Sequence, residues 1–178
     1  MNVYIIGDQG GSCDDYFVLN DPTRNLKYSG DYYCDQLGYN GFPFNFDASP
    51  GWRGPAWYRM AEPAGITIPE EPVYSYHCNG RNAGWLDGHH PTTPGETINA
   101  TICFDLDCDG YTSYSNRIET IQIKHCSSYY LYYLVDLAGT KHRYCSTSTT
   151  LIGNHSVQRF VYINLNFPGH LLLPIGPK

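Results

Sequence analysis

The chain has 178 residues and a formal net charge of −6, and Asp, Glu, Lys and Arg make up 16% of it. The low number of basic residues, 11, argues against a nucleic-acid-binding surface, because such surfaces depend on clustered Lys and Arg. No apolar run is long enough to span a membrane. The 17 tyrosines, 18 glycines and 12 prolines predict many turns, short strands and little helix.

The elements expected in chain order begin with a short apolar segment over residues 1–12. The segment 38–55 is rich in Gly, Pro, Asn and aromatics, which predicts a loop. Its aromatics either pack on the domain or form a recognition surface, and packing is the favoured interpretation. β-prone or alternating residues predict strands, and no segment has a clear helical period. The expected strands are Trp57–Met60, Val73–Cys78, Glu119–His125, Tyr129–Val135 and a further one over 160–167.

Seven cysteines are dispersed along the chain with no Cys-x-x-Cys pair, which argues against zinc knuckles and thioredoxin-type sites. Dispersed cysteines in a chain of low charge predict a secreted module cross-linked by disulfides; a cytosolic protein with reduced cysteines is the alternative. Because seven is odd, at most three bridges form within the chain, and the spacing leaves their connectivity open. The disulfide candidates are Cys13, Cys34, Cys78, Cys103, Cys108, Cys126 and Cys145.

Secretion requires a signal peptide, and the first residues do not have the pattern of one. Residues 1–7 lack a basic region, and their apolar run is shorter than the ~7–15 residues of a signal core. We therefore expect the sequence to be a fragment of a longer extracellular protein.

Several short motifs surround the cysteines in a fixed order. They are Cys13-Asp14-Asp15-Tyr16, Leu19-Asn20-Asp21-Pro22-Thr23-Arg24, Cys34-Asp35, Trp57-Tyr58-Arg59, Cys78, Trp85-Leu86-Asp87-Gly88-His89-His90-Pro91, Cys103, Cys126, Tyr130-Leu131-Tyr132-Tyr133-Leu134 and Arg143-Tyr144-Cys145. This order resembles the cysteine-rich domain of the family that includes uromodulin, the pancreatic zymogen-granule membrane glycoprotein and the liver oncoprotein-induced transcript protein. The resemblance covers residues 12–146 and leaves 1–11 and 147–178 as flanking segments.

The resemblance implies a mainly β, small disulfide-linked extracellular module with long loops and little helix. In the relatives it accompanies EGF-like modules and a zona pellucida module, so such neighbours are expected in a full-length protein. Family members usually carry a cysteine where this chain has Pro72. The loss of that cysteine is our explanation for the odd total, because its usual partner would be left single.

Two Asn-x-Ser/Thr triplets begin at Asn99 and Asn154. Such triplets also arise by chance, but Asn99 matches a glycosylated position in the uromodulin-like proteins. In those relatives glycans on this domain act as decoy ligands for bacterial mannose-binding adhesins. The expected partners are therefore proteins or microbial lectins that recognise the surface or its glycan.

Asp105, Asp107 and Asp109, followed by a glycine, have the spacing that opens an EF-hand-like calcium loop. The acid that should stand at the twelfth position is replaced by Asn116, so an acidic hairpin turn is the favoured interpretation. Calcium is the one cofactor that the sequence suggests, and a calcium-binding adhesion module is the alternative function.

No catalytic motif is recognisable, so no catalytic residue is assigned and an enzyme is disfavoured. His89 and His90 could be a metal or catalytic pair, but adjacent side chains diverge on a strand, and the family match indicates a structural turn. A Cys–His nucleophile requires an exposed thiolate, which bridged or buried cysteines do not offer.

Overall fold

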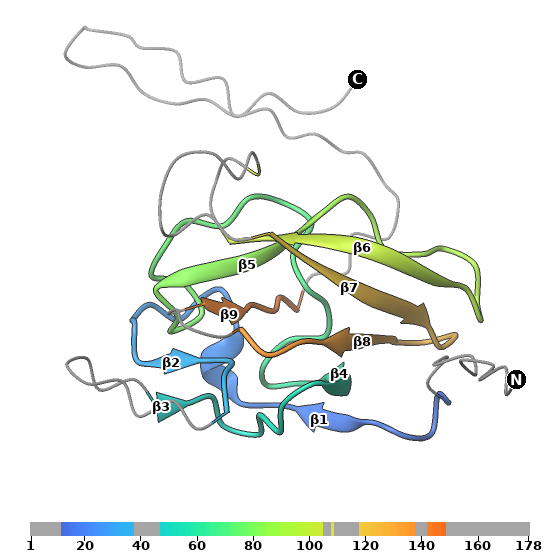
Figure 1. The fold of residues 1–178 in the computed structure, drawn as a ribbon, viewed down its shortest axis with the longest axis horizontal. Helices are drawn as coiled ribbons and strands as arrows, with labels where there is room; N and C mark the ends of the chain where they lie inside the picture. The colour runs from blue at the N-terminus through green and yellow to red at the C-terminus, as the bar shows by residue number, and fades with distance from the viewer. Residues whose placement is uncertain (1–11, 38–46, 105–107, 109–117, 138–141, 149–178) are drawn as a thin grey trace, which may run out of the picture.

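The computed structural model describes residues 12–37, 47–104, 108, 118–137 and 142–148 (Figure 1). Within these ranges the regular secondary structure is almost entirely β strand, with one 3-10 turn, so the expected fold class is confirmed. The elements are β1 (Phe17–Leu19), η1 (Pro22–Arg24), β2 (Tyr33–Cys34), β3 (Asp47–Ala48), β4 (Ala56–Met60), β5 (Asn82–Asp87), β6 (Thr97–Cys103), β7 (Ile118–His125), β8 (Tyr130–Leu134) and β9 (His142–Tyr144).

Seven strands form one sheet in the order β1-β4-β8-β7-β6-β5-β9. The five central strands pair antiparallel, whereas β1 and β9 join the two edges in parallel. Figure 1 shows β6 and β7 as the longest pair, with β1 and β4 at the far edge. β2 and β3 make a separate two-stranded parallel sheet. The sheet therefore pairs segments that are more than 70 residues apart in the sequence, as in β4 and β8.

Side chains along the central strands alternate between a buried inner face and an outer face of the sheet. Ile121 and Ile123 of β7 are buried in the core, as their spacing predicts, and Tyr132 of β8 joins them. Gln122 and Lys124 lie on the opposite face and are partly exposed. The largest core cluster thus covers the inner face, which leaves the outer face of β6 and β7 available to solvent.

The strands expected around Trp57–Met60, Glu119–His125 and Tyr129–Val135 are present as β4, β7 and β8. The prediction of a strand over Val73–Cys78 is wrong, because this segment forms turns with positive φ angles at Tyr76 and Cys78. The strand expected over 160–167 lies outside the described residues.

The aromatic residues divide between core and surface. Trp52, from the segment expected to be a loop, is 5% exposed and stacks on Tyr58 with ring centroids 5.1 Å apart. Packing is therefore confirmed for Trp52, whereas Phe42, Phe44 and Phe46 lie outside the described residues. Trp57 is half-buried beside Tyr133, because its neighbour Tyr58 occupies the inner position of β4.

Candidate functional site

All seven cysteines lie in the described part of the chain, and six of them are bridged. The pairs are Cys13–Cys126, Cys78–Cys145 and Cys103–Cys108. Cys34 is single and fully buried. The tertiary structure therefore selects one connectivity from the many that the spacing allowed.

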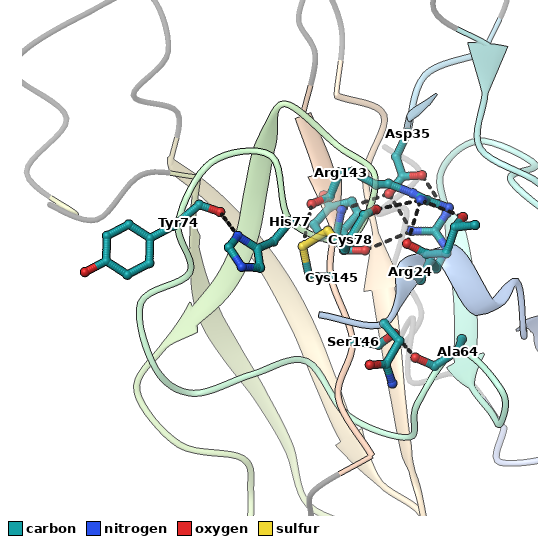
Figure 2. Close-up of a disulfide and its surroundings, with 12 residues drawn as sticks. Arg24, Asp35, Ala64, Tyr74, His77, Cys78, Arg143, Cys145 and Ser146 are labelled. Carbon is teal, nitrogen blue, oxygen red and sulfur yellow. Dashed lines mark hydrogen bonds and ion pairs between the residues drawn. A yellow bond between two sulfur atoms is a disulfide. The ribbon is translucent and has the colours of Figure 1, made fainter. Parts of the chain in front are cut away.

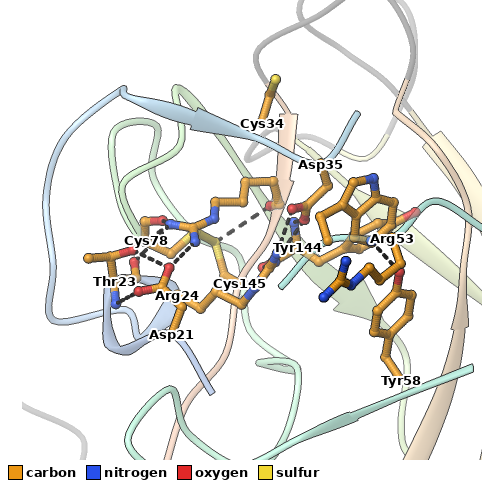
Figure 3. Close-up of polar contacts among 12 residues, drawn as sticks. Asp21, Thr23, Arg24, Cys34, Asp35, Arg53, Tyr58, Cys78, Tyr144 and Cys145 are labelled. Atoms are coloured by element: carbon orange, nitrogen blue, oxygen red, sulfur yellow. Dashed lines mark hydrogen bonds and ion pairs between the residues drawn. A yellow bond between two sulfur atoms is a disulfide. The ribbon is translucent and has the colours of Figure 1, made fainter. Parts of the chain in front are cut away.

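The single thiol of Cys34 is shielded from solvent. Burial raises its pKa to about 11, with Asp35 and Asp136 acting in the same direction. Its Sγ lies 3.9 Å from the carbonyl oxygen of Asp47, and Figure 3 shows it directed away from the nearby ion pair. Because thiolate is the reactive form, Cys34 is not an available nucleophile.

The single cysteine does not belong to the cluster beside Pro72. Val73, the next residue, packs with Cys78, Cys103 and Cys145. Cys34 instead contacts β3. The explanation that the lost cysteine at position 72 leaves its partner single stays a prediction.

Arg24 and Asp35 form an ion pair in which both side chains are fully buried (Figure 3). Arg24 donates from Nη2 to Asp35 Oδ1 at 2.6 Å and from Nη1 to Asp35 Oδ2 at 2.8 Å. Burial would raise the pKa of Asp35, but the adjacent Arg24 guanidinium outweighs it and holds the pKa below its usual value. Asp35 also accepts from the backbone N–H of Tyr144, which fixes β9 to the N-terminal segment.

A second buried arginine, Arg143, lies beside the Cys78–Cys145 bridge (Figure 2). Its guanidinium donates to Asp21 Oδ2 and to the carbonyl oxygen of Cys78, both at 2.6 Å, and to Thr23 Oγ1 at 3.0 Å. Burial lowers the pKa of Arg143 to about 10, with repulsion from Arg24 acting in the same direction. Arg143 thus joins η1, β9 and the turn at Cys78.

These two arginines explain motifs that the sequence alone left without a role. Asp21, Thr23, Arg24, Asp35 and Arg143 come from three separate motifs of the family pattern, and here they form one network. Arg24, Asp35 and Arg143 are buried, Asp21 and Thr23 are partly buried, and all five are paired within this group, so the network is structural. Nothing in the sequence joined them, since up to 122 positions separate the partners.

His89 and His90 both contact the carboxylate of Glu70. Glu70 Oε1 contacts His90 Nδ1 at 2.5 Å, and Glu70 Oε2 contacts His89 Nδ1 at 3.0 Å. His90 Nε2 lies 2.8 Å from the hydroxyl of Tyr132, which also accepts from the N–H of Ile68.

The chemistry of the partners fixes the proton positions around His90. A carboxylate only accepts, so Nδ1 carries the proton and Nε2 accepts from the Tyr132 hydroxyl. Burial lowers the pKa of His90, which keeps the imidazole neutral. Glu70, His90 and Tyr132 thus form a hydrogen-bonded series of carboxylate, imidazole and hydroxyl. Tyr132 is 0% exposed, however, and burial raises its pKa, so its hydroxyl is not accessible as a nucleophile.

Asn99 is exposed near the middle of β6, on the outer face of the sheet. Its backbone is paired with β7, where Gln122 stands opposite. Ala100 faces the core and Thr101 returns to the outer face, so both polar members of the triplet point outward. The other triplet, at Asn154, lies outside the described residues.

The aspartates of the expected calcium loop, Asp105, Asp107 and Asp109, lie outside the described residues. The Cys103–Cys108 bridge is described, and Asp87 is close to both of its sulfurs. Because disulfide sulfurs are not thiolate ligands, these three residues do not form a metal centre. A calcium site in this loop stays a prediction.

Among the residues that the structure describes, no helix is long and apolar enough to cross a membrane. A family model described as the uromodulin-like D8C domain matches residues 58–146, which is half of the chain.

Individual relatives show the same similarity over a longer stretch. The pancreatic secretory granule membrane major glycoprotein GP2 of Mus musculus is 27% identical over 147 residues, covering 78% of this chain and 23% of that protein. The corresponding glycoprotein of Canis lupus familiaris is 25% identical over 142 residues, covering 78% of this chain and 24% of that protein. Uromodulin of Mus musculus is 26% identical over 142 residues, covering 79% of this chain and 19% of that protein. The chain thus spans about a quarter or less of the length of these relatives, and it belongs to the uromodulin-like D8C domain family.

Proposed function

We propose that this chain is an extracellular module that presents an N-linked glycan at Asn99 to a protein partner, such as a microbial lectin. The module would form part of a larger secreted or membrane-tethered protein with neighbouring EGF-like or zona pellucida modules. Its role is binding and presentation rather than catalysis.

The observation that carries the proposal is the place of Asn99 in the sheet. The side chain is exposed, while the backbone that bears it is hydrogen-bonded within a central strand. A glycan here would project from a rigid surface, so a partner would meet a sugar held at a defined position. Two of the relatives are glycoproteins of a secretory granule membrane, which supports an oxidising, glycosylating compartment for this chain.

The disulfides and the buried network support the same role. The bridge Cys13–Cys126 ties the start of the domain to the end of β7, and Cys78–Cys145 ties β9 to the turn before β5. Such cross-links persist where thiols are not kept reduced. The module is therefore suited to act as a stiff carrier outside the cell.

The test is to secrete the chain from eukaryotic cells and to measure glycan occupancy at Asn99 by peptide mass spectrometry. We expect a glycan on the peptide that contains Asn99, and none after Asn99→Gln or Thr101→Ala. The glycosylated protein should bind an immobilised mannose-specific bacterial lectin, and the binding should be lost after Asn99→Gln. An unmodified Asn99 in folded, secreted protein would remove the basis of the proposal.

A further inference from the structure

The strand register places four side chains in one row across the outer face of the sheet. Asn99 of β6 stands opposite Gln122 of β7. Gln122 in turn stands opposite Tyr133 of β8, and Tyr133 stands opposite Trp57 of β4. Residues that are directly opposite in antiparallel strands share a face, so all four side chains leave the sheet on the same side.

The two aromatic residues of this row contact each other. The rings of Tyr133 and Trp57 have centroids 5.6 Å apart and meet edge to face at 65°. Both are half-buried, so they keep an accessible part on the surface. An edge-to-face pair is a favourable arrangement, and here it fixes the position of the Tyr133 ring.

Asn99 has a cross-strand neighbour on one side only. β5 ends at Asp87, which pairs with Thr101, so no strand residue of β5 stands beside Asn99. On the other side Gln122 lies between Asn99 and Tyr133. With strands about 4.8 Å apart, the backbones of Asn99 and Tyr133 are about 10 Å apart. The glycan that starts at Asn99 therefore has a polar amide and then an aromatic ring next to it on the side of β7.

We propose that Tyr133, supported by Trp57, is a contact surface for the core sugars of a glycan on Asn99, with Gln122 hydrogen-bonding to them. This inference rests on the proposed function. The C–H groups on the apolar face of a pyranose ring carry partial positive charge, and the face of an aromatic ring is negative, so the two surfaces attract. The amide of Gln122 offers both a donor and acceptors to sugar hydroxyl and acetamide groups. The glycan would lie across β7 and β8 and would leave the sheet in a fixed direction.

The experiment compares thermal unfolding of the secreted chain with and without its glycan, in the wild type and in variants of Tyr133. Asn99→Gln supplies the unglycosylated form, and mass spectrometry confirms occupancy in every other sample. We expect the glycan to raise the Tm of the wild type by about 2–4 °C, since ring contacts of this kind contribute roughly that much in a chain of this size. The shift should persist in Tyr133→Phe, which keeps the ring, and vanish in Tyr133→Ala.

Tyr32→Ala is the matched control, because Tyr32 is 65% exposed and directly precedes β2, which belongs to the separate two-stranded sheet. Its glycan-dependent shift should equal that of the wild type. The wild type also gives a test without any substitution, in which nuclear Overhauser effects should join the Tyr133 ring protons to protons of the core sugars.

The possible failures can be told apart. If Asn99 carries no glycan, the proposed function and this inference are both wrong. If Asn99 is occupied but the shift is the same in Tyr133→Ala, or the ring shows no Overhauser effect to the sugars, only the contact surface is wrong.

Discussion

Arg24 and Asp35 form a bidentate ion pair in which both side chains are 0% exposed. The pair joins η1 to the residue after β2, and through the backbone N–H of Tyr144 it also reaches β9. A buried pair of this kind does not by itself prove high stability, because desolvation offsets much of the attraction. Removing one partner of the pair nevertheless destabilises the fold strongly, since the remaining charge stays buried without a partner.

Asp35→Asn should therefore destabilise the domain by about 3–5 kcal/mol, because Arg24 would keep its charge in the interior. The measurement is the free energy of unfolding from urea denaturation. Asp15→Asn is the control: Asp15 is exposed, and a surface change of this kind stays within about 0.5 kcal/mol. A loss below about 1 kcal/mol in Asp35→Asn would show that the ion pair is not central to the fold.

His90 should make stability depend on pH in a defined window. Its pKa is lowered by burial from the ordinary value of 6.5, so the unfolded chain binds the proton first as pH falls. The contribution is complete above pH 6.5 and is lost as pH falls from 6.5 through the lower pKa of the folded state. His90→Asn, which keeps a donor for Glu70, should flatten this decline in the free energy of unfolding.

The groups around His90 need separate controls. Glu70 has a lowered pKa because hydrogen bonds from His89 and His90 outweigh its burial, and it acts below pH 4.5. The pKa of His89 is raised by its hydrogen bond to Glu70, so its contribution has the opposite sign. His89→Asn should leave the decline in place. An unchanged slope in His90→Asn would show that a group other than His90 causes the decline.

Cys34 should not react with a thiol reagent in the folded protein. Its pKa of about 11 and its burial leave almost no accessible thiolate at pH 8. Ellman's reagent should detect no thiol under native conditions and one per chain in guanidinium without reductant. Cys34→Ala should give none in either condition. Rapid reaction of the folded protein would contradict the buried position.

The disulfides should differ in their contribution to stability according to the length of chain that they close. Cys78 and Cys145 are 67 positions apart, whereas Cys103 and Cys108 are 5 apart. On the chain-entropy estimate the first contributes about 4 kcal/mol and the second about 2 kcal/mol. Replacing each pair by alanines and measuring urea denaturation should reproduce this order. Equal losses would point to effects in the native state instead.

A calcium loop at Asp105, Asp107 and Asp109 should reveal itself as ligand-linked stability. Millimolar calcium should raise the Tm and a chelator should lower it, because an ion that binds only the folded state stabilises it. Asp107→Asn should abolish the shift, and magnesium should not reproduce it. An unchanged Tm at millimolar calcium would end the calcium alternative.

Local patterns were sufficient for some parts of the fold. The alternation of Ile121 and Ile123 with polar residues predicted β7, and the aromatic run around Tyr132 predicted β8. The same approach was wrong for Val73–Cys78, where the apolar and tyrosine residues suggested a strand. There the chain turns, with positive φ angles, to bring Cys78 to Cys145 and its carbonyl oxygen to Arg143. A long-range cross-link outweighed local β propensity.

The sequence by itself determined the mainly β class and located the candidate glycan site, because composition, periodicity and a three-residue triplet are local properties. The tertiary structure decided which cysteines pair, which arginine meets which aspartate, and that Asn99 and Tyr133 share one row. Those relationships depend on strand register and on contacts between residues that are distant in the chain, which a linear pattern does not encode. For the same reason the sequence shows Arg24 and Arg143 only as members of short motifs, whereas the structure shows that both are buried and form ion pairs.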